Sequence, residues 1–149
     1  MATPSKAETP ATYDDANLLL RLYELRREEK LRQARDWFMK NFHAKTVDEF
    51  LQLCPFGSQE NAYYRMITSY WDMAASFVTN GVLHRDLFVQ NSRELLFVWI
   101  RISDLIPGWR ERMGNPDIVK NLETIANGMI EDEKRQGSYE AFRKLVLGM

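Results

Sequence analysis

Apolar residues recur every three or four positions along most of the chain, which is the pattern of helices that bury one face. The stretch from about 58 to 80 shows this pattern best, because a broad apolar face there lies opposite a polar one. Ser58 can cap its start, and Asn80 followed by Gly81 is a typical stop. The residues predicted to face inward are Ala62, Met66, Ile67, Tyr70, Trp71, Met73, Ala74, Phe77 and Val78.

The N-terminal region predicts one long helix. Thr12 and Asp15 have the spacing of a capping box, and helical periodicity continues from there to about Phe42. A helix of that length would be on the order of 45 Å long. Its middle, residues 26–30, is charged all round, and its last part carries a single apolar stripe. Its first part is apolar on most sides through Leu18, Leu19, Leu20, Leu22, Tyr23 and Leu25.

The segment ELLFVWIRI, residues 94–102, is ambiguous because aromatic and β-branched residues favour strands. No other stretch offers a partner strand, so we expect a central helix that is buried on nearly every side. We expect it to run from Asn91 or Ser92 to about Ile106, where Pro107 ends it. The remaining predicted helices cover about 46–54, 82–90 (a helix or a turn), 116–136 and 138–149.

These elements predict an all-α fold, a compact bundle of five to seven helices with a long N-terminal helix. Residues 1–11 have no apolar face to bury and are expected to form a mobile tail. Residues 12–149 are expected to form a single helical domain, which suits a chain of 149 residues.

Composition narrows the function classes. The formal net charge is −1, so no global field attracts nucleic acid or an anionic membrane. One cysteine excludes an intrachain disulfide and suits a reducing compartment, so we expect a cytoplasmic protein. The longest uninterrupted apolar run, Leu95 to Ile100, is far shorter than the roughly 20 residues that span a bilayer, so we expect no membrane insertion.

The stretch HRDLFVQN, residues 84–91, matches the catalytic-loop pattern of protein kinases letter by letter. In kinases the Asp accepts the substrate's hydroxyl proton and the Asn holds magnesium. The chain has no glycine-rich loop before this stretch and no DFG after it, and the residues upstream form helices. We therefore interpret the match as chance and expect a turn in which Asp86 caps or hydrogen-bonds a short helix. Whether the protein is an enzyme stays open, and a non-enzymatic protein is favoured.

Metal, cofactor and nucleophile signals are weak. His43, His84 and Cys54 lie far apart in sequence, and no metal-binding spacing connects them. Cys54 has no basic neighbour and is expected to be a buried small apolar residue. We therefore predict no catalytic, cofactor-binding or metal residues and no cofactor.

A resemblance adds to this interpretation. From about residue 63 to 133 the chain resembles a family of small all-helical bacterial proteins of unassigned function. The segments that carry the resemblance are Tyr70 to Ala75, Asn80 to Leu83, Asp86 to Phe88, and Glu94 to Trp99. The resemblance implies an all-helical fold and a bacterial source, and it supplies no catalytic residues. Some members begin with a membrane segment, which this chain replaces with a polar tail and a charged helix.

The leading functional hypothesis is a non-enzymatic interaction or regulatory module that self-associates through its N-terminal helix. A monomer would leave part of the leucine-rich surface of this helix exposed to solvent, and large exposed apolar patches mark interfaces. A homodimer that pairs two such helices is the commonest solution. The residues predicted to form the interface are Leu18, Leu19, Leu22 and Leu25.

Two other functions stay open. One is a small-molecule binder or enzyme with an aromatic-lined pocket between helices. Its expected lining is Tyr70, Trp71 and Trp99, with Asp72, His84, Asp86 or Arg101 as polar groups. The other is nucleic-acid binding by the basic residues of the first helix, which include Arg21, Arg26, Arg27, Lys30, Arg32 and Arg35. Acidic residues interleave with them, at spacings that allow the pairs Glu24–Arg27, Glu28–Arg32 and Asp36–Lys40, so a solvated face without nucleic acid is favoured.

Overall fold

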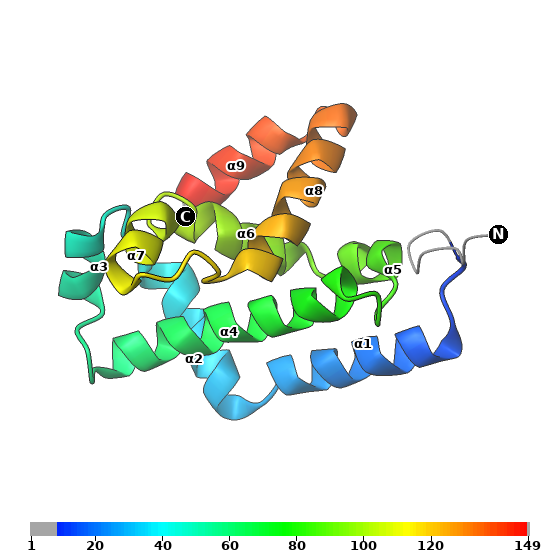
Figure 1. Ribbon diagram of the computed structural model, residues 1–149, viewed down its shortest axis with the longest axis horizontal. Helices are drawn as coiled ribbons and strands as arrows, with labels where there is room; N and C mark the ends of the chain where they lie inside the picture. The colour runs from blue at the N-terminus through cyan, green and yellow to red at the C-terminus, as the bar shows by residue number, and fades with distance from the viewer. Residues whose placement is uncertain (1–8, 149) are drawn as a thin grey trace.

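The computed structural model describes residues 9–148, and in that range the chain forms nine α-helices and no strand (Figure 1). The all-α prediction is confirmed. The helices are α1 (Tyr13–Arg26), α2 (Glu29–Asn41), α3 (Val47–Leu53), α4 (Gln59–Thr79), α5 (Arg85–Gln90), α6 (Arg93–Ile102), α7 (Ile106–Met113), α8 (Lys120–Gln136) and α9 (Tyr139–Gly148). Most of the predicted tail, residues 1–8, lies outside the described residues, and the division into tail and single domain stays a prediction.

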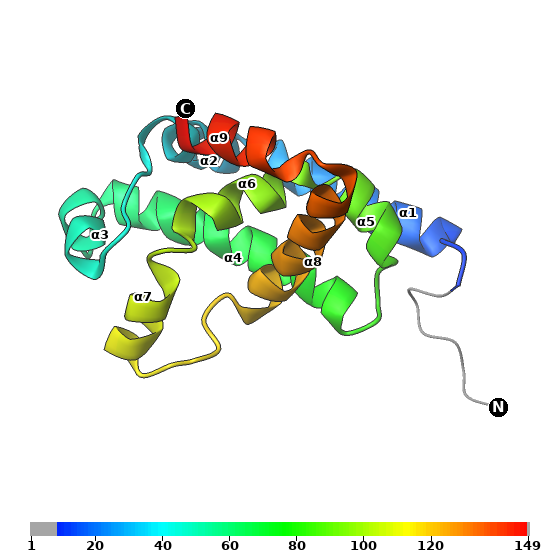
Figure 2. The same ribbon diagram turned by 90° about the horizontal axis from the view of Figure 1, so that it is seen from above.

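The centre of the bundle is formed by α4 and α6. Helices α2 and α8 pack against α4, and α9 packs against α6 and α8 (Figures 1 and 2). All eight residues from Leu95 to Ile102 are buried, so the ambiguous ELLFVWIRI segment is the central helix that the sequence predicts. A helix that is apolar on nearly every side is stable at the centre of the bundle because neighbouring helices cover its faces.

The predicted continuous N-terminal rod is wrong, because the chain breaks at Arg27 and Glu28. Arg27 ends α1, and Glu28 takes an extended conformation with φ −60° and ψ 142°. The Glu28 carboxylate accepts a hydrogen bond from the backbone N–H of Leu31, so it caps α2. The break lets α2 bury Ala34 and Phe38 against the bundle while α1 runs along a different edge. A straight rod could not do both.

A second difference concerns Pro107. The sequence interpretation placed a helix end there, but Pro107 lies in the first turn of α7, where a proline costs no hydrogen bond. The divided rod and this additional helix bring the total above the expected five to seven. Asn115 and Pro116 form a turn rather than a helix start, and α8 begins later, at Lys120.

Three helices begin with a side-chain cap at the residue that the sequence indicates. The Thr12 side chain and the Asp15 side chain form both hydrogen bonds of the capping box at α1. Thr46 and Ser58 cap α3 and α4 through their side chains. None of the helices between residues 9 and 148 combines the length and apolar character needed to cross a bilayer.

Candidate functional site: the two faces of helix α1

Helix α1 lies at the edge of the bundle and packs mainly against α2 and α5. Only two of its residues are buried, Asp15 and Leu22. Long-range hydrogen bonds between described residues attach it: the backbone N–H of His84 donates to Asp15 Oδ1 at 3.0 Å, and the Tyr70 hydroxyl donates to the Leu22 carbonyl at 2.5 Å. Burial raises the pKa of Tyr70, so this hydroxyl stays a donor. Helix α1 is thus anchored at a few points and otherwise open on two faces.

The inner face of α1 closes over a pocket of about 280 Å³. Helix α1 forms one wall, and α4, α5 and the turn between α5 and α6 form the rest. Its lining residues are Leu19, Leu20, Leu22, Tyr23, Arg26, Tyr70, Trp71, Phe88, Asn91 and Ser92. Leu20 and Tyr23 are exposed and mark the side that opens to solvent. We call this the inner-face pocket.

Among the described residues of that lining, Arg26 is the only charged one. Its guanidinium carbon lies 5.2 Å from the ring centre of Tyr23 and 5.3 Å from that of Trp71, which are cation–π distances. Within residues 9–148, no carboxylate lies within ion-pair distance of it. Ser92 lies on another wall and is buried, with 2% of its surface exposed.

The structure confirms part of the predicted pocket lining and places the rest elsewhere. Tyr70 and Trp71 line the inner-face pocket. Trp99 lines a separate, smaller pocket with Ile130 and Tyr139. The predicted polar groups have other partners: Asp72 accepts from the Leu122 backbone N–H, and Arg101 donates to the carbonyls of Phe42 and Val146. His84 and Asp86 belong to the start of α5.

Sequence reasoning missed Arg26, Phe88 and Ser92 as pocket residues. A signal for Arg26 existed. Leu19, Tyr23 and Arg26 are spaced i, i+4, i+7, so they share one face of a helix. Phe88 and Ser92 reach the pocket because α5 and the turn after it pack close to α1. No local sequence pattern indicates that packing.

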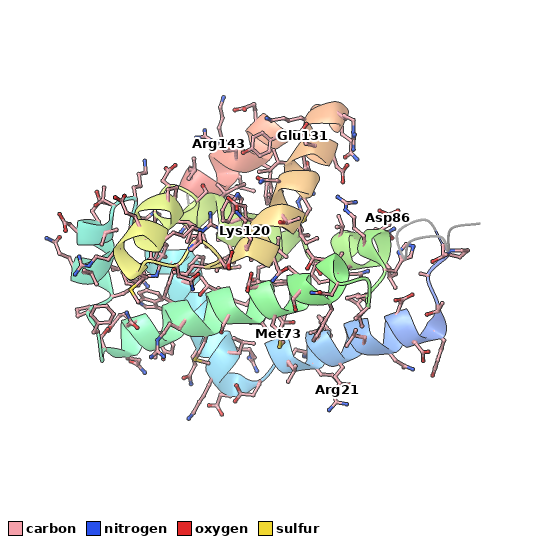
Figure 3. The ribbon with its side chains drawn as sticks, in the orientation of Figure 1. Arg21, Met73, Asp86, Lys120, Glu131 and Arg143 are labelled. Atoms are coloured by element: carbon pink, nitrogen blue, oxygen red, sulfur yellow. The ribbon has the colours of Figure 1, made fainter. Side chains whose placement is uncertain are left out.

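The outer face of α1 is a shallow exposed groove. Its lining residues are Asn17, Leu20, Arg21, Glu24, Leu25 and Glu28. Leu20 is 59% exposed and Leu25 46% exposed, and Arg21 points away from the bundle (Figure 3). We call this the outer face. Of the four leucines predicted for an interface, Leu22 is buried within the chain, Leu18 and Leu19 are partly buried against the core, and only Leu25 is exposed.

The predicted ladder of ion pairs along the first helix is mostly wrong. Asp36 and Lys40 pair at 3.1 Å, but the structure of residues 9–148 shows no Glu24–Arg27 or Glu28–Arg32 ion pair. Glu28 instead caps α2, and the backbone hydrogen bonds it accepts lower the pKa of its carboxyl group. Arg27 lies over the Tyr23 ring, 5.8 Å from its centre.

The kinase-like segment forms a capped short helix. His84, rather than the expected Asp86, caps α5: its Nδ1 accepts from the Leu87 N–H at 3.2 Å, while its Nε2 lies 2.8 Å from the Thr9 carbonyl. Asp86 is exposed and pairs with Arg85 at 3.2 Å. The Asn91 side chain donates to the Leu87 carbonyl. These side chains hold the start and end of α5.

Other candidate chemistry can be placed as well. Cys54 is buried, and burial raises the pKa of its thiol to about 11. Among the described residues no three His, Cys, Asp or Glu side chains gather closely enough to hold a metal ion.

These features define the class of protein: a small all-α bundle with a lightly attached first helix, apolar groups on both faces of that helix and a pocket beneath it. The chain belongs to the family described as a domain of unknown function, DUF4760, which matches residues 11–129. This confirms the resemblance to a family of unassigned function and extends it over α1 and α2. No curated protein and no solved structure matches the chain.

Proposed function

We propose that the protein is a non-enzymatic interaction module that forms a homodimer through the outer face of α1. The observation that carries the proposal is the arrangement of charges around the two exposed leucines of that face. Arg21, Glu24 and Glu28 have no ion-pair partner within residues 9–148. Their spacing makes the face complementary to itself.

Two copies of α1 pair in antiparallel orientation around a point midway between residues 22 and 23. In that register Leu20 of one copy meets Leu25 of the other, Arg21 meets Glu24, and Asn17 meets Glu28. All six residues of the outer face therefore find a suitable partner. A two-fold axis requires this reciprocity, since each contact occurs twice.

The outer face replaces the predicted interface of Leu18, Leu19, Leu22 and Leu25, of which only Leu25 takes part. Two short helices bury less surface than the 1,200 Å² or so of a stable interface, so the dimer is weak. We expect a dissociation constant in the micromolar range, with the two Arg21–Glu24 pairs fixing the register more than the affinity.

Sedimentation equilibrium tests the proposal. We expect a monomer–dimer equilibrium at tens of micromolar protein, and a monomer at that concentration rejects the proposal. Arg21→Glu places a glutamate opposite Glu24 in both contacts and abolishes pairing. Arg21→Glu combined with Glu24→Arg exchanges the charges and restores pairing. Arg32→Glu, an exposed change of the same charge on α2, leaves the equilibrium unchanged and serves as the control.

The alternative function, small-molecule binding between helices, concerns the inner-face pocket, which shares only Leu20 with the outer face among its described lining residues. Nucleic acid is not part of the proposal, because Glu24 and Glu28 interleave with the arginines. A cytoplasmic location fits a chain whose only cysteine has no disulfide partner within it. The bacterial source stays a prediction from the resemblance.

A further inference from the structure

We propose that the inner-face pocket binds a small carboxylic acid with an apolar body. This goes beyond self-association, because it concerns the face of α1 that points into the molecule. The pocket volume of about 280 Å³ leaves room for a ligand on the order of ten non-hydrogen atoms.

The first argument is the charge of Arg26. A guanidinium keeps its charge at every physiological pH and presents paired donors that match the two oxygens of a carboxylate. No acceptor within residues 9–148 engages the donors of Arg26. None of the described lining residues is acidic, so the pocket favours an anion. A cationic ligand is disfavoured, since Arg26 already lies over the rings of Tyr23 and Trp71.

The second argument is the hydroxyl of Ser92. Ser92 stands at the N-cap position of α6, where a serine side chain usually accepts a backbone hydrogen bond, but it makes none. It is 2% exposed, and no residue between 9 and 148 bonds its hydroxyl. Within residues 9–148 no side-chain polar atom is both shielded from solvent and unbonded, so the Ser92 hydroxyl reaches the water of the pocket, and a ligand oxygen would take the place of that water.

The third argument is the apolar remainder of the pocket. Leu22, Trp71 and Phe88 are buried and form its floor, and the Trp71 and Phe88 rings meet edge-on with centres 6.5 Å apart. Such a wall accepts a flat ring or a short chain by burial of apolar surface. The ligand class therefore combines a single carboxylate with an aromatic or short aliphatic group.

Phenylacetate and its neutral isostere phenylacetamide test the proposal. We expect phenylacetate to bind saturably at submillimolar to millimolar concentration in isothermal titration calorimetry. We expect phenylacetamide to bind at least about tenfold more weakly, because a charge-assisted hydrogen bond is replaced by a neutral one. In ¹H–¹⁵N spectra the Trp71 indole signal should shift on binding and the Trp99 signal should not.

Variants test whether Arg26 binds the carboxylate of phenylacetate. In Arg26→Gln, phenylacetate should bind no more tightly than phenylacetamide, and Arg26→Lys should keep part of the preference. Arg21→Gln, the same change on the outer face, should leave binding unchanged. Ser92→Ala should weaken phenylacetate binding a few-fold. Circular dichroism of each variant confirms that it folds.

Three results would overturn the proposal: no phenylacetate binding at several millimolar, equal affinity for acid and amide, or an acid preference that survives Arg26→Gln. Tighter binding of a peptide that ends in phenylalanine would also overturn it, because the pocket would then bind a polypeptide C-terminus instead of a small molecule. The titrations use the Arg21→Glu variant as well, which is expected to be monomeric, so that failure of the pocket and failure of the dimer are seen separately.

Discussion

Helices α1 and α6 have similar sequences in one respect, since both contain a run of residues that is apolar on most sides. Helix α6 lies at the centre of the bundle, and its residues from Leu95 to Ile102 are all buried. Helix α1 lies at the edge and buries only Asp15 and Leu22, leaving Leu20 and Leu25 exposed. Apolar character alone therefore does not decide burial. The position of the helix among its neighbours does, and the surplus apolar surface of α1 is available for binding.

The largest expected effect is the difference between a leucine of α6 and one of α1. Leu96→Ala should lower the free energy of unfolding by about 2–5 kcal/mol, because it opens a cavity in a core that cannot collapse around it. Leu20→Ala should change it by less than about 0.5 kcal/mol. Urea unfolding at submicromolar protein, below the dimer's dissociation constant, measures both. Similar losses for the two variants would contradict the peripheral position of α1.

The next effect concerns the attachment of α1. Asp15→Ala removes the acceptor of the His84 backbone N–H and the carboxylate of the capping box, and should cost about 1–3 kcal/mol. Hydrogen exchange should become faster in α1 and stay unchanged in α6. Asp14→Ala, an exposed change in the same turn, is the control. Uniformly faster exchange throughout the bundle would show that α1 is not a separate unit.

A smaller effect is expected at Tyr70. Tyr70→Phe removes the hydroxyl that donates to the Leu22 carbonyl and should cost about 1 kcal/mol. Thermal unfolding measures the loss, with Tyr23→Phe as the matched change on an exposed ring. Equal melting temperatures for the two variants would mean that this hydrogen bond does not hold α1.

The smallest effect is the acid dependence of the contact between α5 and α8. The Arg85 guanidinium lowers the pKa of Asp132 below its usual 3.8. A lowered pKa in the folded state stabilises the protein above pH 4 or so, and this contribution is lost as the pH falls through the folded-state pKa. Arg85→Gln should therefore be less stable than the parent by at most about 1 kcal/mol at neutral pH. The difference should shrink toward pH 2, whereas Arg112→Gln should show no such trend.

The sequence predicted most helices because their start signals are local. Thr12, Thr46 and Ser58 each accept the backbone hydrogen bond that their position suggests. The break after α1 was not predicted, because glutamate is not a usual N-cap residue and Glu28 takes that role only since α2 turns to pack on α4. Pro107 was misplaced because a proline both ends a helix and begins one, and the neighbouring packing decides which.

The candidate site was predictable only in part. Tyr70 and Trp71 were identified because they are large aromatic residues on a clear helix face. Trp99 is also a large aromatic residue and was expected in the same pocket, but it lies beside α8 and α9, away from α1. Arg26 was counted among the solvated charges, and its contact with Trp71 requires the relative placement of α1 and α4. Tertiary arrangement therefore decides which of several similar residues share a pocket.

The two carbonyls that hold the Arg101 guanidinium have a consequence for biosynthesis. One belongs to Phe42 and the other to Val146, more than a hundred positions apart in the chain. During translation Phe42 and Arg101 leave the ribosomal exit tunnel before Val146 does. The charge in the middle of the bundle receives this acceptor only when α9 has been made, so a nascent chain stalled before α9 would remain a client for chaperones.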